Sequence, residues 1–376
     1  MKELYILDSS YNPTSAGGNR LFAFGLALRK KGIKVTYYYL FPYKNKEKCD
    51  KYLDQLGFVY LWEGSPFRNK YLNTIRSLFK FYKLIKPEIP VYVYSLLDCI
   101  YFLRKKKNIR LYHEYTENPE VIGKVSGPIG NYLYKKYIST IPKLDGLFLI
   151  TSALYDKYIK EFGADPNKTV LLNMVVDKYR FDNLPISEPS NIISYCGIIS
   201  EYKDGVSILI QAFAKVVKLH PEYKLRLIGP FKNKEVENNL FKIVEDEGIK
   251  ESVEFYGVVS PDEMPKILKS SKILALARPN NKQAKFGFAT KIGEYLMTER
   301  PAVLTKVGTI EDYLKDQESC LLAAPDDIDS FAEKLLWAIE NYPLASKIGE
   351  RGKEMALRYF DSEKEVNKII NLIFNA

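Results

Sequence analysis

Short apolar runs alternate with segments of helical period along the whole chain. The first half contains six such runs and the second half another six. In order they are ELYILD, KVTYYYL, PVYVYS, IRLYHEY, GLFLITS and TVLLN, then IISYCGI, YKLRLIG, VEFYG, ILALARP, PAVLT and CLLAA. Runs of this kind, separated by roughly ten to fifteen residues of helical period, are typical of buried strands in βα units. The pattern therefore predicts an α/β protein with parallel sheets.

A segment that contains Pro and Ser, FDNLPISEPSN, separates the two sets of runs. Pro185 and Pro189 disfavour both helix and central strand, so this segment is typical of an interdomain linker. The chain has 376 residues, 46% of them apolar, which is enough for two cores. We therefore predict one domain at residues 1–184, a second at 185–360 and a last helix within 361–376.

The segment KFGFATKIGEYLMTERPAVLT, residues 285–305, combines a loop, a helix start and a buried strand. Thr290 is placed to cap the helix, which leaves the N–H groups of residues 290–292 free to bind an anion. Glu294 follows one turn later on the same face as Thr290 and Lys291, where its carboxylate can accept two ribose hydroxyls. A diphosphate at the helix start and a ribose on Glu294 together indicate a nucleotide sugar.

Glycines follow two of the predicted strands. Gly17 and Gly18 start a helix after the first strand, where they either let backbone amides approach a phosphate or only form a tight turn. The GxGxxG spacing is absent, and KVTYYYL ends without the acidic residue that holds a ribose in dinucleotide enzymes. In the second half, SYCGIISEYKDG places Gly197 after a strand and Lys203 before a helix.

His113 and Glu114 lie near the end of the run IRLYHEY, close to the edge where open α/β sheets bind ligands. A His at this position is explained equally well by a hydrogen bond to the backbone and by a functional role. General acid or base catalysis by Glu114 and the acidic residues after it is not favoured, because such exit loops are commonly acidic for solubility. Glu114 is kept as an acceptor contact.

Residues 285–305 resemble the donor-binding motif of retaining glycosyltransferases of family 4, in the subgroup with a GFPTKLxEYL-type string. The segments SYCGIISEYKDG and LLNMVVDKYRF are similar to the family's diphosphate segment and to its NxVD segment. The resemblance is specific from Ser194 to Gly352. It implies the GT-B fold, in which two Rossmann-like domains with parallel sheets face each other across a cleft and the last helix crosses back to the first domain.

Two positions depart from the family pattern. Ile198 stands where the family has an Arg beside the diphosphate, and Phe286 stands where it has a Glu that holds hydroxyls of the donor sugar. Lys203 matches the family and is the best side-chain candidate for the diphosphate. Further positive charge is expected from the helix start or from one of three other cations, Arg20, Lys285 and Arg278.

The resemblance implies three groups of site residues and no metal or cofactor. The catalytic candidates are His113, Lys203 and Glu294. The donor-binding candidates are Gly17, Gly18, Gly197, Lys203, Gly229, Val258, Phe288, Ala289, Thr290, Lys291 and Glu294. The acceptor-side candidates are Asn19, Arg20 and Glu114. Catalysis is expected to rest on stabilising the leaving nucleoside diphosphate and on orienting the acceptor.

Charge is distributed unequally. Residues 1–184 contain 30 Lys and Arg against 17 Asp and Glu, a net of +13, whereas residues 185–376 contain 26 against 29, a net of −3. The segment Lys70–Lys86 predicts an amphipathic helix, and such helices commonly just cover a sheet. Its predicted apolar face is Leu72, Ile75, Leu78, Phe79, Tyr82 and Ile85. Together with basic clusters at 104–107 and 135–136, it indicates docking on an anionic membrane.

The chain shows no apolar run of about 18 residues, and its first ten residues lack the features of a signal peptide. Its four cysteines form no CxxC pair, which favours reduced thiols. We therefore expect a cytoplasmic protein, peripheral at the inner face of the membrane.

The predicted function is retaining, metal-independent transfer of a hexose-type sugar from a nucleoside-diphosphate sugar to a saccharide or lipid-linked acceptor, in surface polysaccharide or glycolipid synthesis. A GT-B nucleotide-sugar epimerase is an alternative, disfavoured because acidic and His residues are sparse. Ile198 and Phe286 also leave open a non-catalytic nucleotide-sugar-binding protein. A nucleic-acid-binding protein is a further alternative, but no nucleic acid is expected as a partner because no binding module is recognisable.

Overall fold

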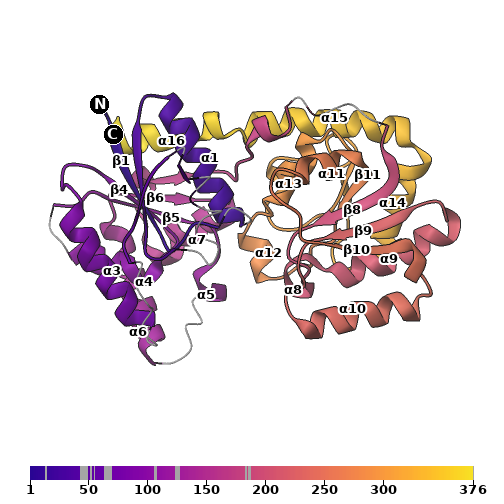
Figure 1. The fold of residues 1–376 in the computed structure, drawn as a ribbon, viewed down its shortest axis with the longest axis horizontal. Coiled ribbons are helices and arrows are strands. Elements are labelled where there is room, and N and C mark those ends of the chain that lie inside the picture. The colour runs from indigo at the N-terminus through magenta and orange to yellow at the C-terminus, as the bar shows by residue number, and fades with distance from the viewer. Residues whose placement is uncertain are drawn as a thin grey trace. The chain divides into compact units, whose positions relative to one another are not determined.

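The chain folds into two compact units, which are described separately (Figure 1). Unit 1 comprises Met1–Met174 and Ser362–Ala376, and unit 2 comprises Val175–Asp361. The computed structural model describes residues 1–12, 15–42, 50, 53–54, 56–62, 70–105, 108–122, 128–182, 184 and 188–375. Cys49, Lys106, Lys107 and part of the predicted linker, 183 and 185–187, lie outside the described residues.

Unit 1 is built around a parallel sheet of seven strands in the order β3-β2-β1-β4-β5-β6-β7. The strands are β1 (Glu3–Asp8), β2 (Lys34–Tyr39), β3 (Gly57–Tyr60), β4 (Val91–Tyr94), β5 (Leu111–Tyr115), β6 (Gly146–Leu149) and β7 (Thr169–Leu171). The predicted parallel sheet is confirmed. The apolar pattern did not predict β3, a short edge strand whose Phe58 and Val59 are only half-buried.

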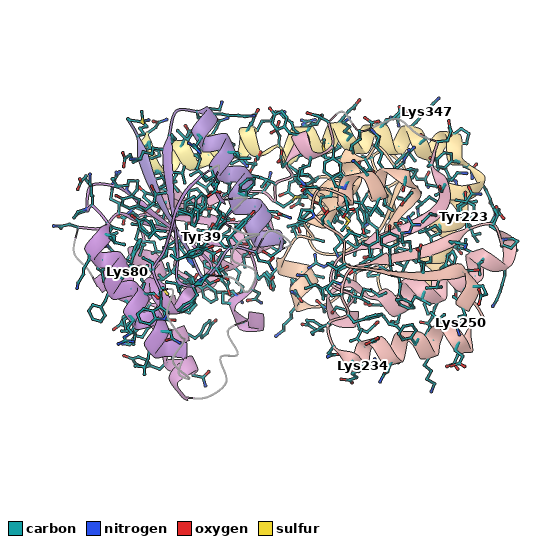
Figure 2. The ribbon with its side chains drawn as sticks, in the orientation of Figure 1. Tyr39, Lys80, Tyr223, Lys234, Lys250 and Lys347 are labelled. Carbon is teal, nitrogen blue, oxygen red and sulfur yellow. The ribbon has the colours of Figure 1, made fainter. Side chains whose placement is uncertain are left out.

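The helices of unit 1 lie between strands of this sheet, except for α16, which comes at the end of the chain. They are α1 (Ala16–Lys30), α3 (Lys70–Leu84), α4 (Leu97–Lys105), α5 (Pro119–Ile122), α6 (Pro128–Ile138), α7 (Ser152–Phe162) and α16 (Ser362–Phe374). Helix α1 lies close to the sheet because Gly25 leaves room for Tyr37, whose hydroxyl donates to the Leu21 carbonyl oxygen at 2.5 Å. The core is rich in buried tyrosines, among them Tyr39, labelled in Figure 2.

Helix α16 belongs to unit 1, although it follows the last residue of unit 2. Its buried Glu365 accepts a hydrogen bond from the Asn173 N–H at 2.8 Å. The first unit ends at Met174, ten residues before the predicted boundary at 184. The difference arises because the next residues pack within unit 2, where Val176 forms a β-bridge with Asp361.

Unit 2 also consists of alternating strands and helices around a parallel sheet. The sheet has six strands in the order β10-β9-β8-β11-β12-β13. The strands are β8 (Ser190–Cys196), β9 (Lys224–Ile228), β10 (Val253–Gly257), β11 (Ser271–Leu276), β12 (Ala302–Thr305) and β13 (Leu321–Ala323). The helices are α8 (Glu201–Asp204), α9 (Val206–Leu219), α10 (Lys234–Asp246), α11 (Met264–Ser270), α12 (Lys282–Phe286), α13 (Lys291–Met297), α14 (Ile328–Glu340) and α15 (Tyr342–Tyr359). All six strands were predicted from the apolar runs.

Helix α3 packs on the sheet through a face that matches the predicted one only in part, since Leu78 and Ile85 of the predicted face are buried. Ser77, Leu78 and Phe81 are buried, and Ser77 donates from its hydroxyl to the Leu40 carbonyl oxygen at 3.2 Å. The Phe81 ring meets Tyr38 of β2 edge-on, with centroids 5.1 Å apart. The small Ser77 therefore lies at the centre of the contact with the sheet.

Three large apolar side chains of α3 lie on the solvent side as a consequence. Leu72, Ile75 and Phe79 are 51%, 38% and 65% exposed, so their predicted place on the buried face is wrong. Lys80 is also exposed on this side and is labelled in Figure 2. In the part of the chain that the structure describes, no helix is long and apolar enough to cross a bilayer.

Candidate functional site

The carboxyl ends of β8, β9 and β10 meet at three glycines. Gly197 and Gly229 have φ of +141° and +131°, values that side-chain-bearing residues rarely adopt. A Cβ on Gly229 would lie 1.9 Å from the Gly197 carbonyl oxygen, so the two loops touch through their backbones. The Gly229 N–H donates to the Gly257 carbonyl oxygen at 2.8 Å. This edge of the sheet is therefore a backbone surface that a ligand can approach closely.

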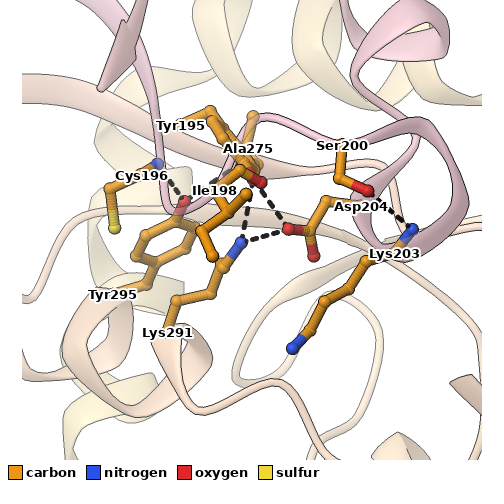
Figure 3. Close-up of polar contacts among 9 residues, drawn as sticks. All are labelled: Tyr195, Cys196, Ile198, Ser200, Lys203, Asp204, Ala275, Lys291 and Tyr295. Atoms are coloured by element: carbon orange, nitrogen blue, oxygen red, sulfur yellow. Dashed lines mark hydrogen bonds and ion pairs between the residues drawn. The ribbon is translucent and has the colours of Figure 1, made fainter. Parts of the chain in front are cut away.

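The Lys291 ammonium lies directly against this surface (Figure 3). Its Nζ is 2.7 Å from Asp204 Oδ2 and 3.1 Å from the Tyr195 hydroxyl. The Tyr195 hydroxyl also donates to Asp204 Oδ2, at 2.7 Å. A Cβ on Gly197 would come within 2.4 Å of Nζ, so only glycine leaves this position open for the cation.

Asp204 is a buried carboxylate, 2% exposed, at the end of the short helix α8. Burial raises its pKa, but the Lys291 ammonium and the hydrogen bonds from Lys291 and Tyr195 outweigh burial and hold that pKa below its usual value. The next residue, Gly205, approaches the Ala277 carbonyl oxygen too closely for a side chain. The result is an ionised carboxylate that fixes a cation at the sheet edge.

Lys203 and Ile198 flank this pair (Figure 3). The Lys203 side chain is exposed, and its ammonium meets no carboxylate among the described residues. Ile198, which replaces the family's Arg, is 56% exposed. Of the alternative cations, Arg278 is buried and donates to the carbonyl oxygens of Gly287 and Gln283. Of these cations, Lys291 therefore lies against Gly197, and Lys203 is exposed one residue before Asp204.

The start of α13 differs in part from the prediction. Thr290 precedes the helix but its side chain makes no capping hydrogen bond, and the helix spans only seven residues. The Ile292 N–H, predicted to be free, donates to the Ala289 carbonyl oxygen at 3.1 Å. A ligand at this end of α13 would therefore depend more on the Lys291 side chain than on free backbone donors.

Glu294 lies in the first turn of α13 and pairs with Arg180, a residue that the motifs did not single out. Arg180 Nη1 is 2.5 Å from Glu294 Oε1, and Nη2 donates to the Pro261 carbonyl oxygen at 2.7 Å. The two side chains are 23% and 21% exposed. The carboxylate predicted to hold a ribose is thus at the surface and already oriented by a guanidinium.

The remaining donor candidates are divided between surface and core. Val258 is 67% exposed beyond β10, and Ala289 is buried. Phe288 packs on Tyr313 and Phe360, with ring centroids 5.5 and 5.4 Å away. A pocket next to this loop is lined by Leu276, Arg278, Gly287, Phe288, Ala289, Ile292, Leu304, Thr305, Val307, Thr309 and Ile310.

The glycine pair of unit 1 is explained by close packing. A Cβ on Gly17 would lie 2.8 Å from the Tyr94 ring, and one on Gly18 would lie 2.1 Å from the Asn12 carbonyl oxygen. Ser15 caps α1 by accepting from the Gly18 N–H at 3.0 Å. Asn19 is half-buried in the same first turn. The alternative of a tight turn therefore accounts for both glycines without a phosphate.

Arg20 and Glu114 form a buried ion pair rather than an open acceptor site. Arg20 Nε is 2.5 Å from Glu114 Oε1, and the two side chains are 2% and 0% exposed. The guanidinium also donates to the carbonyl oxygens of Leu172 and Asn173, and the Tyr92 hydroxyl donates to Glu114. The predicted acceptor-side role does not fit these two residues, because both are buried and each nitrogen of the guanidinium already donates to protein.

His113 is fully buried, which favours the alternative of a hydrogen bond to the backbone over a functional role. Its Nε2 lies 2.6 Å from the Ser95 carbonyl oxygen, and its Nδ1 lies 3.4 Å from the Tyr137 hydroxyl. Burial lowers the pKa of His113 to about 4 despite the hydrogen bond to Ser95. The imidazole is therefore neutral and structural.

A family model independently covers most of unit 2. Residues 177–355 match the model described as glycosyl transferases group 1. This segment is therefore similar to group 1 glycosyltransferase domains. The match spans the glycines, Asp204, Lys291, Glu294 and Arg180 described above.

The curated proteins that this chain resembles are distant from it in sequence. An uncharacterized glycosyltransferase of Methanocaldococcus jannaschii is 22% identical over 79% of this chain and 83% of its own. The poly(ribitol-phosphate) alpha-N-acetylglucosaminyltransferase of Staphylococcus aureus is 22% identical over 64% of this chain. The chain spans only 46% of that second relative.

Solved structures share the fold over the whole chain. HepE of Anabaena, in complex with UDP and glucose, superposes with a TM-score of 0.80 at 14% identity and covers 100% of both chains. WaaG, a glycosyltransferase involved in lipopolysaccharide biosynthesis, superposes with a TM-score of 0.72 at 14% identity, covering 99% of this chain and 100% of its own. The chain therefore has the predicted GT-B fold.

Two contacts at the candidate site were not predicted from the sequence. Arg180 lies within LLNMVVDKYRF, and its partner Glu294 is 114 positions away. Asp204 directly follows Lys203, and its partner Lys291 is 87 positions away. Nothing in the local pattern marks Arg180 as the partner of Glu294, whereas a charged residue at the buried end of a short helix is an indirect signal for Asp204. In the described part of the chain, no group of three His, Cys, Asp or Glu side chains is placed to hold a metal ion.

Proposed function

We propose that this chain is a retaining, metal-independent glycosyltransferase that moves a hexose-type sugar from a nucleoside-diphosphate sugar to a saccharide or lipid-linked acceptor. The observation that carries the proposal is the Lys291 ammonium, held by buried Asp204 against the glycine ends of β8 and β9 within the segment that matches the group 1 model. A fixed cation on an open backbone surface suits a diphosphate. The acceptor class is supported by the similarity to a poly(ribitol-phosphate) alpha-N-acetylglucosaminyltransferase and to WaaG, a glycosyltransferase involved in lipopolysaccharide biosynthesis.

The donor is expected to lie on unit 2 with its diphosphate over Gly197 and Gly229. Lys291 then binds it as a preorganised cation, and exposed Lys203 closes on it from solvent. Glu294 accepts the ribose hydroxyls. In place of the missing Glu at Phe286, the backbone of residues 286–289 binds the sugar hydroxyls.

Transfer would proceed with departure of the nucleoside diphosphate and attack by the acceptor hydroxyl on the same face. The oxygen of the diphosphate keeps the electron pair of the broken glycosidic bond, and it takes the proton that the acceptor hydroxyl loses. Lys291 and Lys203 stabilise the charge that develops on this oxygen. Removing one such charge typically lowers kcat by about 100- to 1,000-fold.

The test of this function is turnover with purified full-length protein. Nucleoside-diphosphate sugars are incubated with and without membrane lipid and oligosaccharide acceptors, and release of nucleoside diphosphate is measured. The proposal predicts release that depends on acceptor, and a product whose NMR spectrum shows the donor's anomeric configuration. An inverted product would refute the retaining mechanism. Sugar isomerisation without acceptor would support an epimerase instead.

The acceptor is proposed to be reached at the inner face of an anionic membrane through α3. This helix exposes Leu72, Ile75 and Phe79, and its exposed Arg76, Lys80 and Lys83 lie among them. Apolar side chains can enter the headgroup region while the cations bind anionic lipid, each contributing about 1 kcal/mol near the surface. The positive net charge of residues 1–184 favours the same partner.

Vesicle sedimentation tests the membrane surface. The full chain is expected to bind phosphatidylcholine vesicles that contain phosphatidylglycerol, and to bind pure phosphatidylcholine much less. Phe79→Ser and the combined Arg76→Gln, Lys80→Gln and Lys83→Gln changes should each release it. A matched control changes three exposed lysines of unit 2 to Gln, Lys234, Lys250 and Lys347, labelled in Figure 2. Equal loss of binding in the control would refute a surface specific to α3.

A further inference from the structure

Arg180 lies in a turn whose preceding residues are anchored within unit 2. The 3₁₀ turn η3 (Lys178–Arg180) starts at Asp177, whose side chain accepts from the Tyr179 N–H at 3.1 Å. Lys178 Nζ is 2.9 Å from Asp361 Oδ2, and Val176 forms its β-bridge with the same Asp361. The position of Arg180 is therefore set by the backbone and not only by its own side chain.

The guanidinium makes two hydrogen bonds that fix its plane. Nη1 donates to Glu294 Oε1 at 2.5 Å and Nη2 to the Pro261 carbonyl oxygen at 2.7 Å. Because the guanidinium is a rigid planar fork, two acceptors on separate segments leave it little freedom. Arg180 thus connects α13 to the loop that follows β10.

The two oxygens of Glu294 are used differently. Oε1 is bound by Arg180, whereas Oε2 receives no hydrogen bond from any residue that the structure describes. The side chain is 21% exposed, so Oε2 is open to a ligand. An ion pair at this exposure adds only about 0–1 kcal/mol to stability, so stabilisation alone is a weak reason for the contact.

We propose that Arg180 is a positioning residue for the donor: by binding one oxygen of Glu294, it presents the other to the ribose hydroxyls. The proposal rests on the function proposed above, because it takes Glu294 as the ribose ligand. Arg180 itself does not need to touch the nucleotide. The effect of Arg180 on nucleotide affinity should therefore depend on the ribose hydroxyls and should not depend on the diphosphate.

Calorimetric titration of the full chain with UDP and with 2′,3′-dideoxy-UDP separates these effects; the GDP pair is used if UDP does not bind. The wild-type protein should bind the ribose form about 10- to 100-fold more tightly, as expected when a hydrogen bond to a charged group is lost. Arg180→Ala should reduce this preference at least about threefold while leaving the affinity for the dideoxy form unchanged. Arg180→Lys keeps the charge but not the fork and should recover only part of the preference.

Glu294→Gln and Lys215→Ala complete the experiment. Lys215 forms a surface ion pair with Asp329 elsewhere in unit 2, so its loss should leave both affinities unchanged. If Glu294→Gln removes the ribose preference and Arg180→Ala does not, the positioning role is overturned while the donor site stands. If Glu294→Gln keeps the preference, the ribose assignment itself is overturned. If Arg180→Ala weakens both ligands equally, Arg180 acts on the diphosphate or on the fold, which also overturns the proposal.

Discussion

Lys291→Met removes the charge that Asp204 faces while keeping an unbranched side chain of similar length. In the native protein the two groups are 2.7 Å apart, and their side chains are 12% and 2% exposed. After the substitution the Tyr195 hydroxyl still donates to the buried carboxylate, but Asp204 has lost its ion-pair partner and keeps only the weaker electrostatic effect of Arg278. The variant therefore tests whether Lys291 is the charge partner that keeps Asp204 ionised.

Breaking a buried ion pair from one side typically costs about 3–5 kcal/mol. In a unit of this size, each kcal/mol lowers Tm by about 2–4 °C, so the transition of unit 2 should fall by about 6–20 °C at neutral pH. Lys215→Met is the matched control. Its partner Asp329 is 75% exposed, so an effect of at most about 1 kcal/mol is expected.

The pKa of Asp204 sets the direction in which the stability from this pair changes with pH. The folded-state pKa of Asp204 lies below its ordinary value of 3.8, so the stability from this pair is fully present at neutral pH and is lost as the pH falls below about 4. In Lys291→Met, burial without the Lys291 ammonium raises that pKa, and the carboxylate can take up a proton at higher pH. The Tm difference between wild type and variant should therefore narrow on acidification.

Scanning calorimetry of the full chain between neutral pH and about pH 4 measures both quantities. The ionic role of Lys291 would be refuted by a Tm loss no larger than that of Lys215→Met. A loss that stays constant with pH would contradict it as well, because packing alone has no proton to exchange.

Three further predictions follow from the same contacts. Gly229→Ala should strongly destabilise unit 2 in thermal unfolding, since its Cβ would lie 1.9 Å from the Gly197 carbonyl oxygen; Gly248→Ala, at φ +69° with nothing within 4 Å, is the control and should cost only about 1 kcal/mol. The lowered pKa of His113, about 4, means that the unfolded state binds more protons between about pH 4 and 6.5, so this residue adds stability as pH rises through that window. Burial raises the pKa of Asp8 to about 7, so this residue makes the protein less stable as the pH rises. The quantity to measure is therefore the difference in unfolding free energy between wild type and His113→Phe. In denaturant unfolding this difference should grow with pH. Sugar transfer should be unchanged by EDTA, whereas loss of activity restored by Mg²⁺ or Mn²⁺ would contradict a metal-independent reaction.

The sheets were predictable because their strands are nearly continuous apolar runs. Strand β3 was not predicted because its four residues lie at the sheet edge and are only partly buried. For α3 the period predicted a helix but not the side that packs, because Ser77 and Phe81 form the contact while Phe79 faces solvent. Helical spacing alone does not show which of two mixed faces meets the sheet.

The candidate site was predictable where local backbone geometry decides it. Gly197 and Gly229 at strand ends are visible in the sequence, since only glycine suits their positive φ. The pairs of Asp204 with Lys291 and of Arg180 with Glu294 are not visible, because each joins residues distant along the chain. Strand β5 shows the opposite case. Its carboxyl end, near which His113 was expected to meet a ligand, lies in the core of unit 1, because this parallel strand is buried along its whole length.

Binding of nucleotide sugars to wild-type protein and Lys291→Ala, followed by thermal shift, tests the central claim most directly. The account predicts that at least one nucleoside-diphosphate sugar, at 100 times its dissociation constant, stabilises the wild-type chain by about 2.7 kcal/mol. The same ligand should give no shift with Lys291→Ala relative to that variant's own baseline. A full shift in Lys291→Ala, or no shift of the wild-type protein by any nucleotide sugar, would contradict a donor site built on this cation.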